Sequence, residues 1–314
     1  MVIWSLCAVT VAIIAAVGFL PALALGTRRR LAVFLVLGTA VALSPLLVPL
    51  GSTVARTLCT GFAVVLMMKM WDLHVGAIRG QPTSVGDGLA FYVNVFFLVS
   101  RKHGLERQPS KARNTRDLSL GLVGVGVTSV LLWLLLRSNW SGVPYFVEHC
   151  LKAPVFFLFA VALFQTCVAV TRLIGGYVVT FSDMPFIART PAEFWRRYNR
   201  LVGQFLYEDV FKLARDSRHV GRATLGAFLV SGLIHEYLFA MVIGRPQGYQ
   251  LAFFLLQGSA VALTLGVKPT GGQAIAWRLG TLAFNLVSSV FFFASAQGVF
   301  RFYQQGLPAW LSDW

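Results

Sequence analysis

The sequence predicts an all-α fold, a multi-pass bundle of transmembrane helices. Hydrophobic residues make up 57% of the 314 residues and charged residues 12%, whereas a soluble domain carries about 25% charged residues. The mean hydropathy is +0.71. Proline and glycine punctuate a series of apolar runs, and no polar block is long enough to fold alone. We therefore expect one membrane domain over residues 1–314.

About eight apolar runs are expected to span the bilayer, each close to the roughly 20 residues that a crossing needs. They cover residues 2–25, 31–50, 56–72, 118–136, 153–175, 223–243, 249–267 and 278–300. The run 89–100 is too short to cross and is expected to be re-entrant or interfacial. The first run has no basic residue ahead of it and no small-residue cleavage motif, so we expect a retained helix instead of a signal peptide.

The distribution of positive charge predicts the orientation. If residues 89–100 do not cross, the Arg28–Arg30 cluster and the basic stretch from Arg101 to Arg116 lie on one side, with most of the 27 lysine and arginine residues. By the positive-inside rule that side is cytoplasmic, and both termini face the opposite side. This bias and the attraction to anionic lipids account for the net charge of +15. We therefore expect the bilayer as a partner and no nucleic acid.

Other polar residues along the chain predict no additional site. The cysteines lie in apolar segments without the spacing of a zinc site or of a disulfide framework; they are Cys7, Cys59, Cys150 and Cys167. Asp72 and His74 are interpreted as interfacial residues at the end of the third span. We expect no metal site.

A histidine and a glutamate interrupt the apolar run 223–243, at His235 and Glu236. An ionisable side chain at that depth costs at least ~2.5 kcal/mol, so it usually faces a protein interior or a water-filled cavity. Neighbours on a helix point about 100° apart, so the two cannot share one narrow stripe. A polar contact between two helices is one interpretation, and a functional site is the one that we favour.

The stretch 190–208 is predicted to form an amphipathic helix on the cytoplasmic membrane surface. Thr190, Pro191 and Glu193 make a capping box with proline at the first helical position. An aromatic and aliphatic arc then opposes a basic arc that contains Arg196, Arg197 and Arg200. Asn199 falls at the edge of the apolar arc, either as a boundary residue or directed inward.

Two motifs in this part of the chain stand in the order of a known family. The first is Phe194-Trp195-Arg196-Arg197-Tyr198-Asn199, preceded by Pro185-Phe186 and Thr190, and the second is Ser231-Gly232-Leu233-Ile234-His235-Glu236. They resemble the Phe-Trp-x-Arg-Trp-Asn box and the Ser-Gly-x-x-His-Glu element of the membrane-bound O-acyltransferases, especially the wax synthase branch. The resemblance is specific over about 181–243, the expected catalytic core. Tyr198 replaces the usual tryptophan, which puts the shape of the acceptor in doubt.

The resemblance implies acyl transfer from acyl-CoA to the hydroxyl of a lipophilic alcohol, as in wax ester synthesis. His235 would be the general base, since histidine has an unperturbed pKa of about 6.5. Asn199 would stabilise the thioester carbonyl or the oxyanion. No Gly-x-Ser-x-Gly nucleophile motif is found, which favours direct attack by the alcohol. The residues expected to contact substrate are Phe194, Trp195, Arg196, Arg197, Tyr198, Arg200, Ser231 and Glu236.

Acyl-CoA is thus expected as a co-substrate, without a bound cofactor. An internal substrate tunnel is expected to run from the cytoplasmic side to His235, with Asn199 and His235 both lining it. The arginine-rich face would suit the phosphates of coenzyme A, although the positive-inside bias explains any single arginine equally well. The alternative is a non-catalytic or proton-coupled transporter that uses the His235–Glu236 pair. A transporter would be expected to show repeats and ionisable residues on several spans, and we find neither, which favours the enzyme.

Overall fold

A computed structural model describes residues 2–105, 107–214 and 219–312. These residues form helices and turns, and no β-strand occurs among them. Within these ranges, seven helices are long and apolar enough to cross a membrane. The predicted all-α membrane fold is confirmed.

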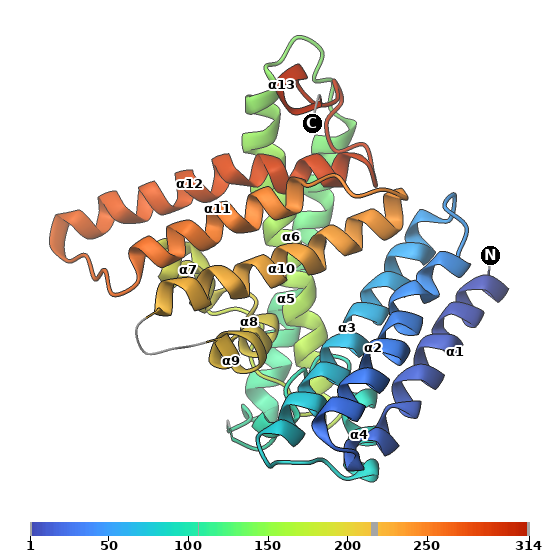
Figure 1. The fold of residues 1–314 in the computed structure, drawn as a ribbon. Coiled ribbons are helices and arrows are strands. Elements are labelled where there is room, and N and C mark those ends of the chain that lie inside the picture. Colours follow the sequence, from blue (N-terminus) through green and yellow to red (C-terminus); the bar gives the residue numbers. More distant parts are fainter. Residues whose placement is uncertain (1, 106, 215–218, 313–314) are drawn as a thin grey trace.

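The first three long helices pack against one another at one side of the molecule (Figure 1). They are α1 (Val2–Gly18), α2 (Thr27–Leu43) and α3 (Thr53–Ile78). The buried face of α1 consists of alanines, whose small side chains let the neighbouring helices approach closely. Short 3-10 turns, η1 (Leu20–Ala24) and η2 (Ser44–Leu47), follow α1 and α2, each with a proline in its first turn.

The segment after α3 is too short to cross, as expected. It contains the nine-residue helix α4 (Val85–Val93) and the 3-10 turn η3 (Ser100–Lys102). Arg30 at the start of α2 donates to His74 at 3.2 Å, and Arg101 in η3 contacts Asp72. Both basic clusters therefore meet the same end of α3, as the predicted topology requires. The membrane face on which this end lies stays a prediction.

The second half of the molecule contains a helical hairpin and three helices that lie across it (Figure 1). The hairpin is α5 (Lys111–Arg137) and α6 (Tyr145–Leu173), and the three helices are α10 (Val220–Ile243), α11 (Tyr249–Thr264) and α12 (Gly271–Gln297). Helix α10 packs on both α3 and α11, and α12 packs on α11 and α6. Helix α10 therefore joins the two halves. A last short helix is α13 (Ala309–Ser312).

Helix α11 differs from the expected span 249–267. It has 16 residues, which is about 24 Å of helix and shorter than the hydrocarbon core of a bilayer. Gly266, at φ 79°, and Pro269 follow it, and neither residue favours continuing a helix.

Candidate active site

The stretch 190–208 does not form the single helix expected from the sequence. Thr190 caps α7 (Pro191–Arg197) as predicted, and its hydroxyl accepts from the Glu193 amide at 3.1 Å. The helix then stops, because Tyr198 is extended and Asn199 has the left-handed φ of 42°. Asparagine is one of the few residues that adopt this conformation readily. The helical-wheel position expected for Asn199 was therefore wrong.

Asn199 instead begins a second short helix, α8 (Arg200–Leu206). Its Oδ1 accepts from the Val202 amide at 3.3 Å, which is an N-cap. The Asn199 Nδ2 has no protein partner within the described residues, so it can donate to another group. The backbone on either side is tied down, since the Arg200 amide donates to the Phe181 carbonyl at 2.7 Å. The break thus holds the amide of Asn199 in a defined place.

The aromatic residues before the break form one cluster. Phe194 is buried, and the ring of Tyr198 lies 4.7 Å from that of Phe157 on α6. The Trp195 Nε1 donates to the Gln257 side chain on α11 at 2.8 Å. The predicted substrate residues Phe194, Trp195 and Tyr198 therefore also hold α7 against α6 and α11.

The three arginines of this region have different environments. Arg197 pairs with Glu193 at 2.8 Å and with Asp183 at 3.5 Å, so its charge is already compensated. The Arg196 side chain is exposed, whereas Arg200 is half-buried. Of the three, Arg196 is the best placed to meet an anionic group from solvent.

The second motif lies on α10, and His235 is held there in one tautomer. Its Nδ1 lies 2.8 Å from the Ser231 carbonyl, which can only accept a hydrogen bond. Nδ1 therefore carries the proton, and Nε2 of the neutral ring keeps a free lone pair. The ring is half-buried and lies 4.4 Å from the ring of Phe254 on α11. This is the form of histidine that a general base requires.

Glu236 is placed differently from the substrate contact expected for it. The side chain is buried, and its two oxygens accept hydrogen bonds from the backbone amides of Gln247, Gly248 and Gln250. These amides lie at the start of α11.

One aromatic ring connects the two motifs. Phe254 lies 4.4 Å from His235 and 5.8 Å from Trp195, measured between ring centroids. The structure thus brings the Trp195 end of the first motif to the histidine of the second. Asn199 lies beyond Trp195 and Tyr198, at the start of α8.

An apolar cavity of about 510 Å³ lies beside these motifs, between α3, α8, α10 and the segment 209–214. Its lining residues are Val64, Met67, Met68, Trp71, Phe205, Asp209, Val210, Leu213, Ala214, Val230 and Ile234. Neither Asn199 nor His235 lines it, in contrast to the expected chamber lined by both. The cavity does reach Ile234, the residue before His235, on one turn of α10.

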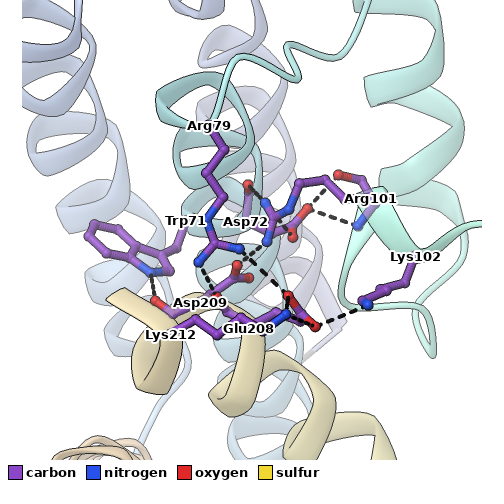
Figure 2. A network of polar contacts seen from close by, with 9 residues as sticks. Trp71, Asp72, Arg79, Arg101, Lys102, Glu208, Asp209 and Lys212 are labelled. Carbon is purple, nitrogen blue, oxygen red and sulfur yellow. Dashed lines mark hydrogen bonds and ion pairs between the residues drawn. The ribbon is translucent and has the colours of Figure 1, made fainter. Parts of the chain in front are cut away.

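A network of buried charges includes two residues that line this cavity, Trp71 and Asp209 (Figure 2). Arg101 contacts the carboxylates of Asp72, at 3.1 Å, and of Asp209. Both carboxylates are fully buried. The expected helix end at Asp72 and His74 was wrong, because α3 continues to Ile78, and both side chains are buried in polar contacts.

Asp209 belongs to η5 (Tyr207–Phe211), a short π-helix that is followed by α9 (Lys212–Ala214). Burial and the nearby charge of Asp72 raise the pKa of Asp209 to about 8. Its neighbour Glu208 contacts Lys102 at 3.1 Å and Lys212 at 2.9 Å (Figure 2). The network therefore attaches the segment after α8 to the end of α3. An aspartate inside an apolar span was the sequence signal for it, but its partners lie far away along the chain.

Replacing Arg101 by methionine is expected to destabilise the protein by about 3–5 kcal/mol, because it leaves two buried carboxylates without their shared cation. Thermal unfolding in detergent would measure this loss. Arg79→Met is the matched control, since Arg79 is at the partly exposed rim of the network and such a pair contributes ~1 kcal/mol or less. Equal effects of the two substitutions would contradict the central place of Arg101.

Comparison with known proteins gives a consistent set of relatives. The profile of the membrane-bound O-acyltransferase family matches residues 151–293. A long-chain-alcohol O-fatty-acyltransferase of Simmondsia chinensis is 32% identical over 215 residues, which are 64% of this chain and 60% of the relative. The acyl-CoA–sterol O-acyltransferase 1 of Arabidopsis thaliana is 27% identical over 218 residues, 60% of each protein.

A sterol O-acyltransferase 2 of Rattus norvegicus is 36% identical over 93 residues, 28% of this chain and 17% of the relative. The chain thus spans no more than 60% of the length of these relatives. The part of the chain that the family profile matches contains both motifs, since residues 151–293 include Asn199 and His235.

Proposed function

We propose that this chain is a membrane-bound O-acyltransferase, which transfers a fatty acyl group from acyl-CoA to the hydroxyl of a lipophilic alcohol. The names of its relatives support this substrate class, since they include acyltransferases of long-chain alcohols and of sterols. The observation that carries the proposal is the bond from His235 Nδ1 to the Ser231 carbonyl, which leaves Nε2 ready to accept a proton.

In the proposed reaction, Nε2 of His235 removes the proton of the alcohol while the oxygen attacks the thioester carbon. The Nδ2 of Asn199 donates to the carbonyl oxygen as it becomes negative. The carbon–sulfur bond then breaks, and the proton passes from His235 to the departing thiolate of coenzyme A. The products are an ester and free coenzyme A, and the exposed Arg196 is proposed to meet the phosphates of coenzyme A.

We propose that the apolar cavity beside Ile234 takes the hydrocarbon chain of one substrate. Val230→Trp would then shorten the longest chain that is used, because the indole fills part of this space. Burying one methylene group contributes about 0.8 kcal/mol to substrate binding. If the indole excludes three methylene groups from the cavity, turnover of the longest substrates would fall roughly 50-fold.

The chain-length profile of the ester products, measured by mass spectrometry over a series of acyl-CoAs and alcohols, tests this prediction. Leu229→Trp is the matched control, since Leu229 is on the same helix but exposed and outside the cavity lining. An unchanged profile in the Val230→Trp variant would show that the chain binds elsewhere.

The expectation that ionisable residues concentrate on one span was wrong, since α3 carries the buried Asp72 and α6 carries the buried Glu148 and His149. The transporter alternative is still less well supported than the enzyme, for a different reason. A proton relay needs a carboxylate that can take up and release protons, whereas both Glu236 oxygens accept from backbone amides at the start of α11. The proposed activity is tested by supplying labelled acyl-CoA and a panel of alcohols to membranes from a host without neutral-lipid synthesis. Labelled esters support it, and labelled free fatty acid alone would contradict it.

A further inference from the structure

We propose that Glu236 is a positioning residue, which fixes the start of α11 on α10 and thereby holds the Phe254 ring against His235. This inference rests on the proposed function, in which His235 acts on the substrate. In this proposal Glu236 supports the position of His235 and does not contact the substrate. Four observations carry it.

The first is the set of bonds that Glu236 makes. Its Oε1 accepts from the amides of Gln247 and, at 2.7 Å, of Gly248, and its Oε2 accepts from the amide of Gln250 at 3.2 Å. The first amides of a helix have no partners within the helix and carry a partial positive charge. A buried carboxylate here satisfies two of these donors, at the N-cap Gly248 and at Gln250, binds the amide of Gln247 just before the helix, and complements the helix dipole. Glu236 thus clamps the start of α11.

The second is the close packing of α10 on α11. A Cβ added to Gly232 would lie 3.2 Å from the Cβ of Phe254, and one added to Gly258 would lie 2.6 Å from the Cβ of Phe228. Side chains of each helix therefore rest on the backbone of the other. A shift at the start of α11 cannot be absorbed by flexible side chains in between, because close-packed interiors transmit such displacements.

The third is what α11 carries. Phe254 lies four residues after Gln250, one helical turn along α11, with its ring 4.4 Å from that of His235. One turn further, Gln257 accepts from Trp195 at 2.8 Å and donates to Ser288 on α12 at 2.8 Å. Helix α11 is therefore the common support of both motifs.

The fourth is the spacing within the second motif. Neighbours on a helix point about 100° apart, so His235 can contact the ring of Phe254 while Glu236 binds the start of α11. Ser231 fixes the tautomer of His235, and Gly232 makes room for Phe254. The other three polar or small residues of this motif thus each have a contact that bears on the position of His235; they are Ser231, Gly232 and Glu236.

Kinetics of Glu236 variants in purified, folded protein test the proposal. Glu236→Ala is expected to lower kcat about 10²-fold, the loss typical of a misplacement of about 1 Å. Glu236→Gln keeps one carbonyl acceptor and is expected to lose about 10-fold less than alanine. The KM for acyl-CoA should stay unchanged in both variants. A raised KM with unchanged kcat would make Glu236 a substrate contact and overturn the proposal.

A glycine pair on α10 provides matched variants that leave the carboxylate intact. Gly232→Ala presses on Phe254 and is expected to lower kcat in the same pattern, whereas a Cβ at Gly226 meets nothing within 4 Å. Gly226→Ala should therefore keep the kcat of the unsubstituted protein. Equal kcat in the two glycine variants would contradict the role of α10–α11 packing.

Amide hydrogen exchange of the segment 247–254 tests the clamp without any need for activity. Faster exchange of this segment in Glu236→Ala than in the unsubstituted protein is expected, with the exchange of α5 unchanged. Unchanged exchange at 247–254 would overturn the proposal, even if the protein esterifies alcohols. An unsubstituted protein that forms no ester would overturn the proposed function, while the exchange result still decides whether Glu236 holds α11.

Discussion

Replacing His235 by alanine is expected to lower kcat for ester formation by about 10²–10⁴-fold, because it removes the base that takes the proton of the alcohol. The protein should remain folded, since the His235 side chain makes one hydrogen bond, to a carbonyl in its own helix. The measurement is the rate of ester release per folded molecule in detergent or nanodiscs, with saturating acyl-CoA.

His149→Gln is the matched control for that substitution. His149 is also a buried histidine on a spanning helix, and it contacts the Tyr303 hydroxyl at 2.7 Å and the Leu286 carbonyl at 2.9 Å. We expect this variant to lose stability but to keep the kcat of each folded molecule. A His235→Ala variant that retains more than about half of the unsubstituted rate would end the assignment of His235 as the base.

Asn199→Asp should lower kcat by roughly 10²–10³-fold with little change in the KM for acyl-CoA, if Asn199 stabilises the oxyanion. The change is selective, because aspartate tolerates the left-handed backbone and keeps an oxygen that caps α8. What it loses is the Nδ2 donor, and it places a negative charge beside the developing one.

The Asn199→Gly variant tests whether a loss of kcat comes from the missing side chain or from a changed backbone conformation. Glycine adopts the φ of 42° without strain but has neither the donor nor the cap. We expect it to fold with a modestly weakened α8 and to lose kcat as aspartate does. An aspartate variant with full kcat would reduce Asn199 to a helix cap, and a rise in KM alone would make it a substrate-positioning residue.

Most of the membrane fold could be predicted because hydropathy and length are local properties. The α3 and α6 spans lie where apolar runs predicted them, and the run 89–100 was correctly excluded as too short. Helix α11 was overestimated, because its apolar composition continues past Thr264 while its hydrogen-bonded turns do not.

Local sequence patterns could not predict the shape of the candidate site. The helical wheel treated 190–208 as one helix, but the left-handed conformation of Asn199 depends on contacts such as that of the Arg200 amide with the Phe181 carbonyl. The pairing of Arg101 with Asp72 and Asp209 was likewise hidden, because it joins residues far apart in the sequence. Glu236 was assigned to substrate because no local pattern shows that the start of α11 returns to it.

The central claim is that one folded protein joins an acyl group to an alcohol through His235. The most direct measurement is a single-turnover reaction of purified protein in nanodiscs with labelled acyl-CoA and a long-chain alcohol, following ester and free coenzyme A together. Both products are expected at the same rate and in equal amounts, and at least about 100-fold more slowly with His235→Ala. Release of coenzyme A without ester, or ester formation at more than about half of the unsubstituted rate in the His235→Ala protein, would contradict a reaction through His235.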